Sequence, residues 1–437
     1  MERLLKSAME QADQAEVLAV ETRSKAFNYY NYRSTDLLEK EHLEVSLRVI
    51  KDGKIGVSRG SLTAEPNKMV EAALTSAAYG APVSFTFPAQ KSNTQTAEIY
   101  DSRLAALTAE DIARDGQKIL KMAKAKAPEM PLNIYIESQT KKVHILNSSG
   151  KNESYEMTIY TFCLLHMFER SKEGINKEIV SCQYFKFPEE KLDELIEEYN
   201  YTLKPVAVST RPMSILFRPS ATWSLLYRVL VGASGENYVK EITPLKGKIG
   251  NKIFPESVTL IDDPTRNWCP GSVPFDDEGV PTLKKFIVEK GILRNFIFDL
   301  DSGARSGKGS SGNGFKRSMW NRGIDISPNP RFTNLVLETG DWDYRDMIKD
   351  MEEGVIVNDV IGFHSGNMLQ GEFSMNVGIG AYVKNGKVVG RAVDTMVTGN
   401  IYEDFFNLKA LGKTIEYNPQ SYTPDMYFAK MSVSGAG

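Results

Sequence analysis

The side chains of this chain with the clearest chemical potential form a run of three carboxylates, Asp276, Asp277 and Glu278. Paired carboxylates can hold a metal ion or share acid and base roles in catalysis. The same residue types also build acidic turns, in which the side chains accept hydrogen bonds from backbone N–H groups. The run alone leaves both interpretations open.

Histidines give little support for a metal site. The chain has four, His42, His144, His166 and His364, and no two are close in sequence. A catalytic zinc needs about three protein ligands and a base that activates water. A lone histidine is more often a surface or core residue than a ligand. The sequence therefore predicts no metal and no cofactor.

The cysteines also argue against a metal or disulfide framework. Cys163, Cys182 and Cys269 are odd in number and widely spaced. This pattern fits neither a set of disulfides nor a zinc knuckle, and it favours a reducing compartment.

A glycine-rich segment follows the carboxylate run. Gly307, Gly309 and Gly312 have the spacing of a dinucleotide-binding fingerprint, but that fingerprint opens a helix, and no helical pattern follows here. The segment 303–308 is predicted to be a surface loop without a ligand. The stretch 306–314 is expected to be mobile when no peptide is bound, because it is rich in glycine and serine.

These residues must be positioned by a mixture of helices and strands. Apolar residues alternate over 43–49, and Asp52-Gly53 predicts a hairpin turn back into 55–57. A helix is predicted from Pro66 to about Gly80, and another after the capping box of Thr108 and Asp111. Further strands are predicted at 133–137, 143–146 and 155–168.

The second half of the chain is richer in strand patterns. Helices are predicted at 220–232 and 344–351, and hairpins at Lys290-Gly291 and Asn385-Gly386. Prolines interrupt the pattern between Asn200 and Pro219. The sequence therefore predicts an α+β protein with two domains, a mixed α/β domain at 1–205 and a strand-rich domain at 206–437.

Bulk properties exclude several function classes. The net charge of −3 gives no electrostatic footprint for nucleic acid, so no direct nucleic-acid binding is predicted. The first residues, MERLLKSAMEQADQAE, do not resemble a signal peptide, and no apolar stretch is long enough to span a membrane. We expect a cytoplasmic protein with no membrane association.

Several motifs in the second half occur together and in order. They are Asp-Asp-Glu-Gly-Val-Pro-Thr at 276–282, Ser-x-Gly-Asn-Gly at 310–314, Gly-Glu-Phe-Ser at 371–374 and Thr-Gly-Asn at 398–400. This arrangement resembles the TldD/PmbA family, also called modulators of DNA gyrase. The resemblance covers nearly the whole chain and is strongest over 261–400. Because both branches of that family share the carboxylate run, the resemblance favours an acidic turn.

The resemblance also indicates what this chain lacks. The catalytic branch carries a His-Glu-x-x-x-His zinc motif on a helix that corresponds to 220–237 here. Alignment places Tyr227, Arg228 and Gly232 at the motif positions, and a shift by one residue would place Leu226, Tyr227 and Val231 there. Neither register supplies a ligand. The family's third ligand is a cysteine near the C-terminus, and this chain has no cysteine after Cys269.

The family resemblance implies a non-catalytic, PmbA/TldE-like subunit of a zinc metallopeptidase complex, with a peptide substrate. Its partner would be a TldD-type catalytic subunit, a second copy, or both. On the matched motifs we expect peptide contacts from a set of polar or loop-forming residues, Ser310, Asn313, Gly314, Asn367, Glu372, Phe373 and Ser374. Replacing Phe373 or Asn313 is expected to lower activity of the complex without unfolding the chain.

Two alternatives remain. The chain could be an independent hydrolase with a divergent metal site around His364, Glu372 and Asp276. It could also be a peptide-binding protein that cleaves nothing, since exposed sheet edges can accept a peptide as an added strand.

Overall fold

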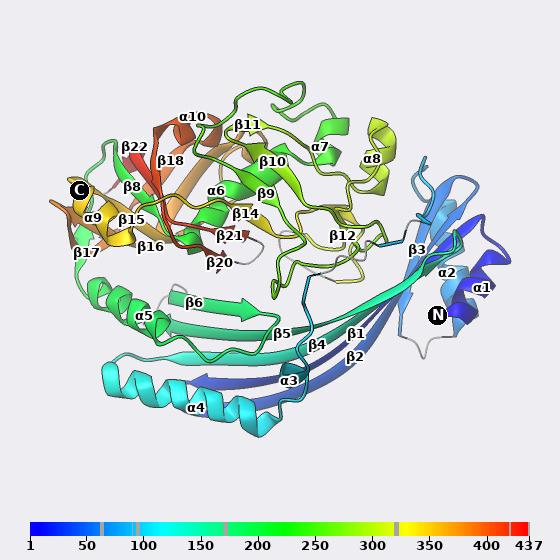
Figure 1. Ribbon diagram of the computed structural model, residues 1–437, viewed down its shortest axis with the longest axis horizontal. Coiled ribbons are helices and arrows are strands. Elements are labelled where there is room, and N and C mark those ends of the chain that lie inside the picture. The colour runs from blue at the N-terminus through cyan, green and yellow to red at the C-terminus, as the bar shows by residue number, and fades with distance from the viewer. Residues whose placement is uncertain are drawn as a thin grey trace.

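Long antiparallel strands form the first half of the molecule (Figure 1). The computed structural model describes residues 1–61, 65–89, 91–92, 97–168, 174–318, 323–418 and 421–435. Within these residues the first sheet has the strand order β3-β2-β1-β4-β5-β6. Its strands are β1 (Gln14–Tyr30), β2 (Arg33–Lys51), β3 (Lys54–Gly60), β4 (Asn133–Asn147), β5 (Asn152–Met167) and β6 (Gly174–Ser181).

The predicted hairpin at Asp52-Gly53 joins β2 to β3 and is confirmed. Both residues have positive φ angles, +50° and +71°, which is the backbone of a tight hairpin turn. The alternation over 43–49 predicts a half-buried strand before the turn. Residues 45–50 are instead all buried, because α2 covers one face of the sheet and the second half of the chain covers the other.

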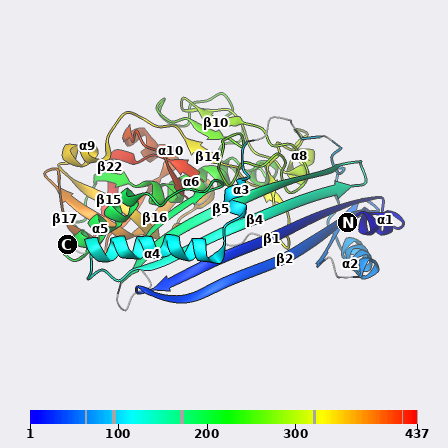
Figure 2. The same cartoon turned by 60° about the horizontal axis from the view of Figure 1, so that its bottom comes forward.

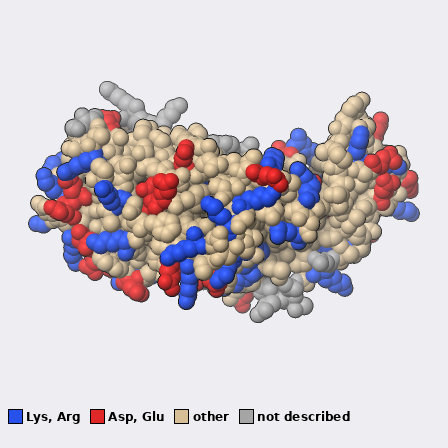
Figure 3. Space-filling view, turned by 90° about the horizontal axis from the view of Figure 1, so that it is seen from above, with Lys and Arg blue, Asp and Glu red and all other residues tan. Residues whose placement is uncertain are grey.

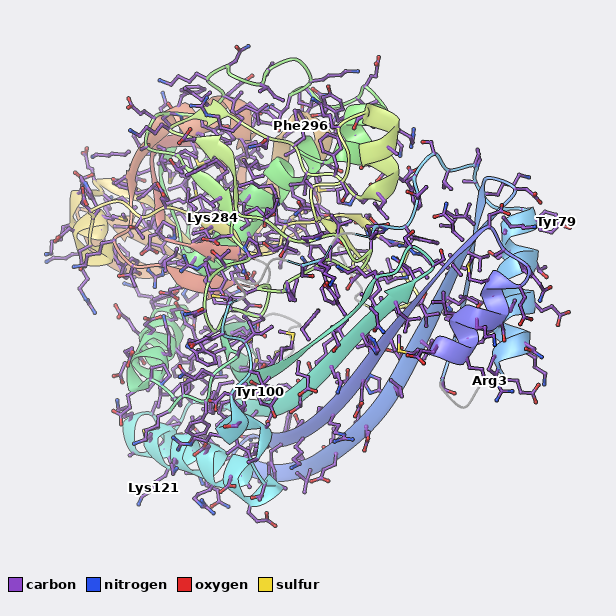
Figure 4. The ribbon with its side chains drawn as sticks, turned by 45° about the vertical axis from the view of Figure 1, so that its right-hand side comes forward. Arg3, Tyr79, Tyr100, Lys121, Lys284 and Phe296 are labelled. Atoms are coloured by element: carbon purple, nitrogen blue, oxygen red, sulfur yellow. The ribbon has the colours of Figure 1, made fainter. Side chains whose placement is uncertain are left out.

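Helices pack mainly on the convex face of this sheet. They are α1 (Glu2–Met9), α2 (Pro66–Ala78), α3 (Ser102–Ala105), α4 (Ala109–Lys126) and α5 (Glu189–Thr202). The capping box of Thr108 and Asp111 begins α4, as predicted. In Figure 4, Arg3 and Tyr79 mark α1 and α2 at one end of the sheet, and Lys121 marks α4 at the other. No helix in the described residues combines the length and apolar character needed to cross a bilayer.

Side chains of β1 point alternately to the two faces of the sheet, and both faces are covered. Val17 belongs to the cluster under α1 and α2, whereas Leu18 packs with Phe275 of the second half on the concave face. Successive side chains of a strand point to opposite faces, so a strand covered on both sides is apolar at both parities. For that reason β1 shows no clean alternation, and the sequence did not predict it.

The second half contains two further large sheets with α6 (Pro219–Gly232) between them. One has the order β15-β8-β22-β18-β16-β17-β7, with β19 beside β22, and the other has the order β11-β10-β9-β14-β21-β20. Their strands are β7 (Pro205–Ala207), β8 (Met213–Phe217), β9 (Leu260–Asp262), β10 (Lys285–Glu289), β11 (Ile292–Leu293), β14 (Leu335–Leu337), β15 (Glu353–Ile361), β16 (Glu372–Lys384), β17 (Lys387–Val393), β18 (Met396–Asn400), β19 (Leu408–Leu411), β20 (Glu416–Asn418), β21 (Ser421–Thr423) and β22 (Met426–Ser434). Residues of α6 and of both sheets form one core.

The remaining elements are short. They are α7 (Gly235–Val239), α8 (Leu300–Ser306), α9 (Tyr344–Asp350), α10 (Ile401–Asp404), the 3₁₀ turns η1 (Met368–Gln370) and η2 (Phe405–Asn407), and the pair β12 (Gly314–Phe315) and β13 (Asn329–Pro330). The predicted helices α6 and α9 are confirmed, as are the hairpins at Lys290-Gly291 and Asn385-Gly386.

The prediction of a loop at 303–308 is wrong. Helix α8 begins at Leu300 because Asp299 and Ser302 form a capping box, and it ends at Gly307, whose φ of +69° is left-handed. The sequence contains this capping box, but the glycines that follow it led to the prediction of a loop.

The α+β class with two domains is confirmed. Strands of the first sheet all precede residue 182, and β7 pairs with β17 of the second half. In Figure 2 the long strands β1, β2, β4 and β5 of the first sheet run side by side. The division at residue 205 stays a prediction.

A buried group of charges joins the two halves. This Arg48 cluster consists of Glu16, Arg48, Glu278 and Lys316, all at most 5% exposed. Arg48 Nε donates to Glu16 Oε1 at 2.8 Å, and a terminal nitrogen of Arg48 donates to Glu278 Oε1 at 2.8 Å. Lys316 Nζ lies 3.3 Å from Ser46 Oγ. One guanidinium thus bridges a carboxylate of the first sheet and a carboxylate of the second half.

Burial changes the titration of this cluster. It raises the pKa of Glu16 from 4.5 to about 7, since burial outweighs the nearby charge of Arg48 and the Glu278 charge adds to it. Burial lowers the pKa of Lys316 to about 8, and the Arg48 charge adds to that shift. Both groups are therefore poised close to neutral pH.

Glu16→Gln should change how stability depends on pH. Because folding raises the pKa of Glu16, its contribution to stability is present below about pH 4.5 and is lost as pH rises through about 7. The free energy of unfolding of the natural protein, relative to Glu16→Gln, should fall by roughly 2 kcal/mol between about pH 5 and pH 8. Denaturant unfolding at several pH values measures this. The exposed Glu71→Gln is the control, and a pH-independent difference for Glu16→Gln would contradict the expectation.

Candidate functional site

Residues predicted to contact peptide fall into two groups, and both groups are connected to α6. The first lies where η1 leads into β16. Asn367 caps the start of η1, since its Oδ1 accepts from the Gln370 N–H, and Glu372 is exposed at the first position of β16. Phe373 is only 3% exposed, and Ser374 Oγ lies 3.2 Å from Met396 Sδ. Within this group Asn367 and Glu372 offer their side chains to solvent.

The second group is held by hydrogen bonds inside the protein. Ser310 Oγ donates to the Phe298 carbonyl at 3.2 Å. Asn313 is fully buried, and its Nδ2 donates to Asp262 Oδ2 at 2.7 Å. The Gly314 N–H donates to Asp276 Oδ2 at 2.7 Å. These contacts shape the chain around Asn313, and in this structure they do not present it to an outside ligand.

Burial revises one expectation about variants. Asn313 and Phe373 were expected to tolerate replacement without unfolding. Both side chains are enclosed in the second half, so replacing either one is expected to lower stability as well as any activity. Glu372 and Asn367 are the better positions at which to test contacts with a partner or a peptide, because their side chains are exposed.

Tyr227 connects the two groups. Its ring packs against Trp223 with centroids 5.3 Å apart and against Phe363 with centroids 5.9 Å apart. A guanidinium nitrogen of Arg331 donates to the Tyr227 hydroxyl at 3.3 Å, and the backbone carbonyl of Arg331 accepts from Asn313. Tyr227, which the predicted alignment places at the first motif position, therefore belongs to an aromatic cluster.

Arg228, at the second position of the same predicted alignment, is 0% exposed. Its guanidinium donates to four backbone carbonyls. The distances are 2.5 Å to Ser224, 3.0 Å to Phe363, 2.9 Å to Ser365 and 2.6 Å to Glu372. Among the residues that the structure describes, no carboxylate forms an ion pair with it. Burial lowers its pKa to about 10, so Arg228 is a cation at neutral pH.

Gly232, at the third position of that predicted alignment, lies against the hydroxyl of Tyr402. A Cβ built at residue 232 would lie 2.3 Å from that oxygen and 3.1 Å from a methyl of Leu245. The Tyr402 ring stacks on Phe254 at 5.9 Å and lies against Gly371. Space at this position is therefore taken by the hydroxyl, and a larger side chain would not fit without movement.

These three positions do not fit a zinc ion. A zinc site needs anionic or neutral N, O or S donors with free lone pairs. Tyr227 places its ring in a packed cluster, Arg228 supplies a positive charge, and Gly232 has no side chain. The alternative register, Leu226, Tyr227 and Val231, also lacks ligands. Within the described ranges, no group of three or more His, Cys, Asp and Glu side chains is arranged to hold a metal.

The carboxylate run forms an acidic turn. Asp276 accepts from the backbone N–H groups of Glu278, Val280 and Gly314. Asp277 accepts from the Lys316 N–H, and Glu278 accepts from the Leu300 N–H that begins α8. The motif therefore anchors neighbouring backbone segments.

The divergent site considered for an independent hydrolase does not assemble. Asp276 is buried in the turn, with its pKa raised by burial and by the charge of Glu278. His364 and Glu372 are exposed around η1. Nothing in the described contacts brings the three side chains together.

A cavity lies between the two halves of the chain. It has a volume of about 330 Å³ and lies between the concave face of the first sheet and the segment that carries β12. Its lining mixes apolar side chains such as Leu18 and Met157 with charged ones such as Lys141 and Lys316. No pattern in the sequence indicates this cavity, because the residues that line it are far apart along the chain.

Two residues that shape the site were not predicted. Tyr402 follows the matched Thr-Gly-Asn motif by two positions, and its N–H is capped by Asn400 Oδ1. Arg331 lies between the two groups and contacts both Tyr227 and Asn313. Tyr402 could have been considered because it lies close to a matched motif. The residues around Arg331 belong to no matched motif, so the sequence did not point to it.

Known proteins are similar to this chain in sequence and in fold. Residues 210–435 match the family model described as the PmbA/TldA metallopeptidase C-terminal domain. An uncharacterized protein of Methanocaldococcus jannaschii is 26% identical over 416 residues, which covers 93% of each chain. A protein of Archaeoglobus fulgidus named a metalloprotease is 32% identical over 234 residues, covering 53% of this chain and 52% of that one. The crystal structure of TldE from Thermococcus kodakarensis superimposes over 100% of both chains, with a TM-score of 0.88 and 24% identity.

Gly232→Ala should reveal the contact with Tyr402. An added methyl would lie 2.3 Å from the Tyr402 hydroxyl, so the free energy of unfolding should fall by about 1–3 kcal/mol. Tyr402→Phe removes an oxygen that has no hydrogen-bond partner in the described structure, so alone it should be neutral or stabilising. Combined with Tyr402→Phe, the alanine should cost much less. Denaturant unfolding of the four proteins measures this, and purely additive effects would contradict it.

The purified chain should carry no stoichiometric zinc, because the three positions supply no ligand set. Elemental analysis after dialysis measures the bound metal. About one tightly held transition metal per chain, removed by chelator with loss of structure, would overturn this expectation.

Proposed function

Since this chain belongs to the PmbA/TldD metallopeptidase family, we propose that it is a PmbA/TldE-like, non-catalytic subunit of a cytosolic zinc metallopeptidase complex that processes peptides or unfolded segments. The observation that supports the proposal is the set of contacts made by Tyr227, Arg228 and Gly232, the residues that the predicted alignment places at the zinc-motif positions. Arg228 puts a buried positive charge at one of them, and the Tyr402 hydroxyl takes the side-chain space at another. A zinc ion and its water have no place there.

A subunit without its own metal acts by shaping a site that another chain supplies. Holding a substrate in the reactive orientation can contribute a large part of a rate enhancement. The exposed side chains of Asn367 and Glu372 lie beside the filled positions and are available to a partner or to an extended peptide. A TldD-type catalytic subunit is the partner that we propose.

Charge and thiol content support the compartment and the type of ligand. Acidic and basic side chains are interspersed over the face shown in Figure 3, and the net charge is −3. This surface does not favour a nucleic-acid ligand. Cys163, Cys182 and Cys269 are free thiols, which suits a reducing cytoplasm.

A second candidate function is peptide binding without cleavage. Residues 33–44 of β2 pair with β1 on one side, whereas β3 pairs only with residues 45–51. The other edge of 33–44 is exposed and includes Leu37 and Leu38, at 49% and 40% exposure. An extended peptide could add to this edge as a further strand. Charged residues along the strand oppose such pairing, so this candidate ranks second.

Cleavage of an unfolded peptide should require both chains. The assay compares this chain alone, a TldD-type partner alone, and their mixture. We expect cleavage by the mixture to exceed that of the partner alone, and none from this chain alone in chelator. Cleavage by this chain alone with chelator present, or equal activity of the partner without it, would show that the proposal is wrong.

Glu372→Lys should weaken the effect of this chain on its partner by roughly 3- to 10-fold, the change expected when about 1 kcal/mol of contact is lost. Glu71→Lys on α2 is the matched control, since Glu71 is also exposed and lies in the first half. Equal effects of the two substitutions would argue against a role for the β16 end of the site.

A further inference from the structure

Residues 362–371 form a folded loop between β15 and β16 that turns at glycines. Gly362, Gly366 and Gly371 have φ angles of +75°, +89° and +84°, a region that favours glycine. His364, Asn367 and Gln370 are exposed on its surface. The loop therefore presents polar side chains on a backbone that needs anchoring from beneath.

Anchors beneath the loop come from two places. At its far end the Gly371 carbonyl accepts from the Ile401 N–H, and the Gln370 carbonyl accepts from Asn400 Nδ2. At its near end the carbonyls of Phe363 and Ser365 both accept from one guanidinium nitrogen of Arg228, at 3.0 and 2.9 Å. Arg228 thus holds the half of the loop that Asn400 does not.

The same guanidinium ties the loop to two rigid elements. It donates to the Ser224 carbonyl within α6 and to the Glu372 carbonyl at the start of β16. The guanidinium carbon also lies 5.6 Å from the centre of the Phe373 ring, within cation–π range. Helix, loop and strand therefore meet at one buried cation.

Holding these four carbonyls requires the planar guanidinium group of an arginine. An arginine presents its N–H donors in fixed, divergent directions, whereas a lysine ammonium is a compact point charge. A lysine ammonium at this position could not reach all four carbonyls, because they belong to three separate segments. Without the guanidinium, the carbonyls of Phe363 and Ser365 would lose the donor that they share, and a lost hydrogen bond of this kind is costly.

We propose that Arg228 is the positioning residue of this site, a built-in cation that fixes the loop 362–371 through backbone carbonyls and makes its shape independent of any metal. The use of the loop by a partner or peptide rests on the proposed function. The anchoring itself does not, because it follows from the contacts of this chain alone.

Hydrogen–deuterium exchange of the full chain tests the proposal. Arg228→Met keeps most of the volume but has no donor, and Arg228→Lys keeps the charge but not the fork. In both variants the amides of 362–372 should exchange at least severalfold faster, while the amides of β1 and β4 keep their protection. Val229→Ala, at the next and also fully buried position, is the control for general loosening of α6 and should spare the loop.

Chemical rescue separates positioning from packing. In Arg228→Ala, guanidinium chloride at a concentration below denaturation should restore loop protection, whereas sodium chloride of equal ionic strength should not. Chelator or added zinc should leave the loop of the natural protein unchanged.

Several results would overturn the proposal. They are a folded Arg228→Met or Arg228→Lys with natural loop exchange, equal loosening by Val229→Ala, rescue by both salts or by neither, and loosening of the natural loop by chelator. If Arg228→Met does not fold, Arg228→Lys decides by the same measurement. Failure of the two-chain cleavage assay would leave this result untouched, so the two proposals fail separately.

Discussion

Burial of α6 on every side decides what this site can contain. Eleven of its fourteen residues are buried, and its core is shared with both neighbouring sheets. Any polar group on such a helix must find its partners inside the protein, because water is excluded. Arg228 meets this demand with four carbonyls, and Thr222 with the carbonyl of Arg218 one turn earlier. The fold thus permits a charged residue on α6 only where backbone acceptors converge.

Buried cations are stabilised in two different ways in this molecule. Arg48 lies between Glu16 and Glu278, and these charges outweigh burial and raise its pKa. Arg228 lies among neutral carbonyls, and burial lowers its pKa. The first arrangement joins two halves of the chain by charges whose titration changes near neutral pH. The second depends on backbone shape, so it couples the helix to the conformation of a loop.

The sequence predicted those parts of the fold that rest on local signals. Capping residues located α4, and Asn385-Gly386 located a hairpin, because these signals act over a few residues. It missed β1, because coverage of both faces removes the alternation that marks a strand. It assigned 303–308 to a loop because glycines outweighed the capping box at Asp299. It also expected Asn313 and Phe373 to be free for contacts, and the surroundings that bury them come from distant segments.

The site shows the same division between local and distant information. The residue types at 227, 228 and 232 could be read from the sequence, whereas the groups that surround them could not. Gly232 is explained only by the hydroxyl of Tyr402, 170 positions later in the chain, and Arg228 only by carbonyls of 363, 365 and 372. A histidine or glutamate left on this buried helix without a metal would be a polar group short of partners. A histidine or glutamate introduced at position 228 or 232 would therefore meet a site that already holds a fixed positive charge or an occupied space.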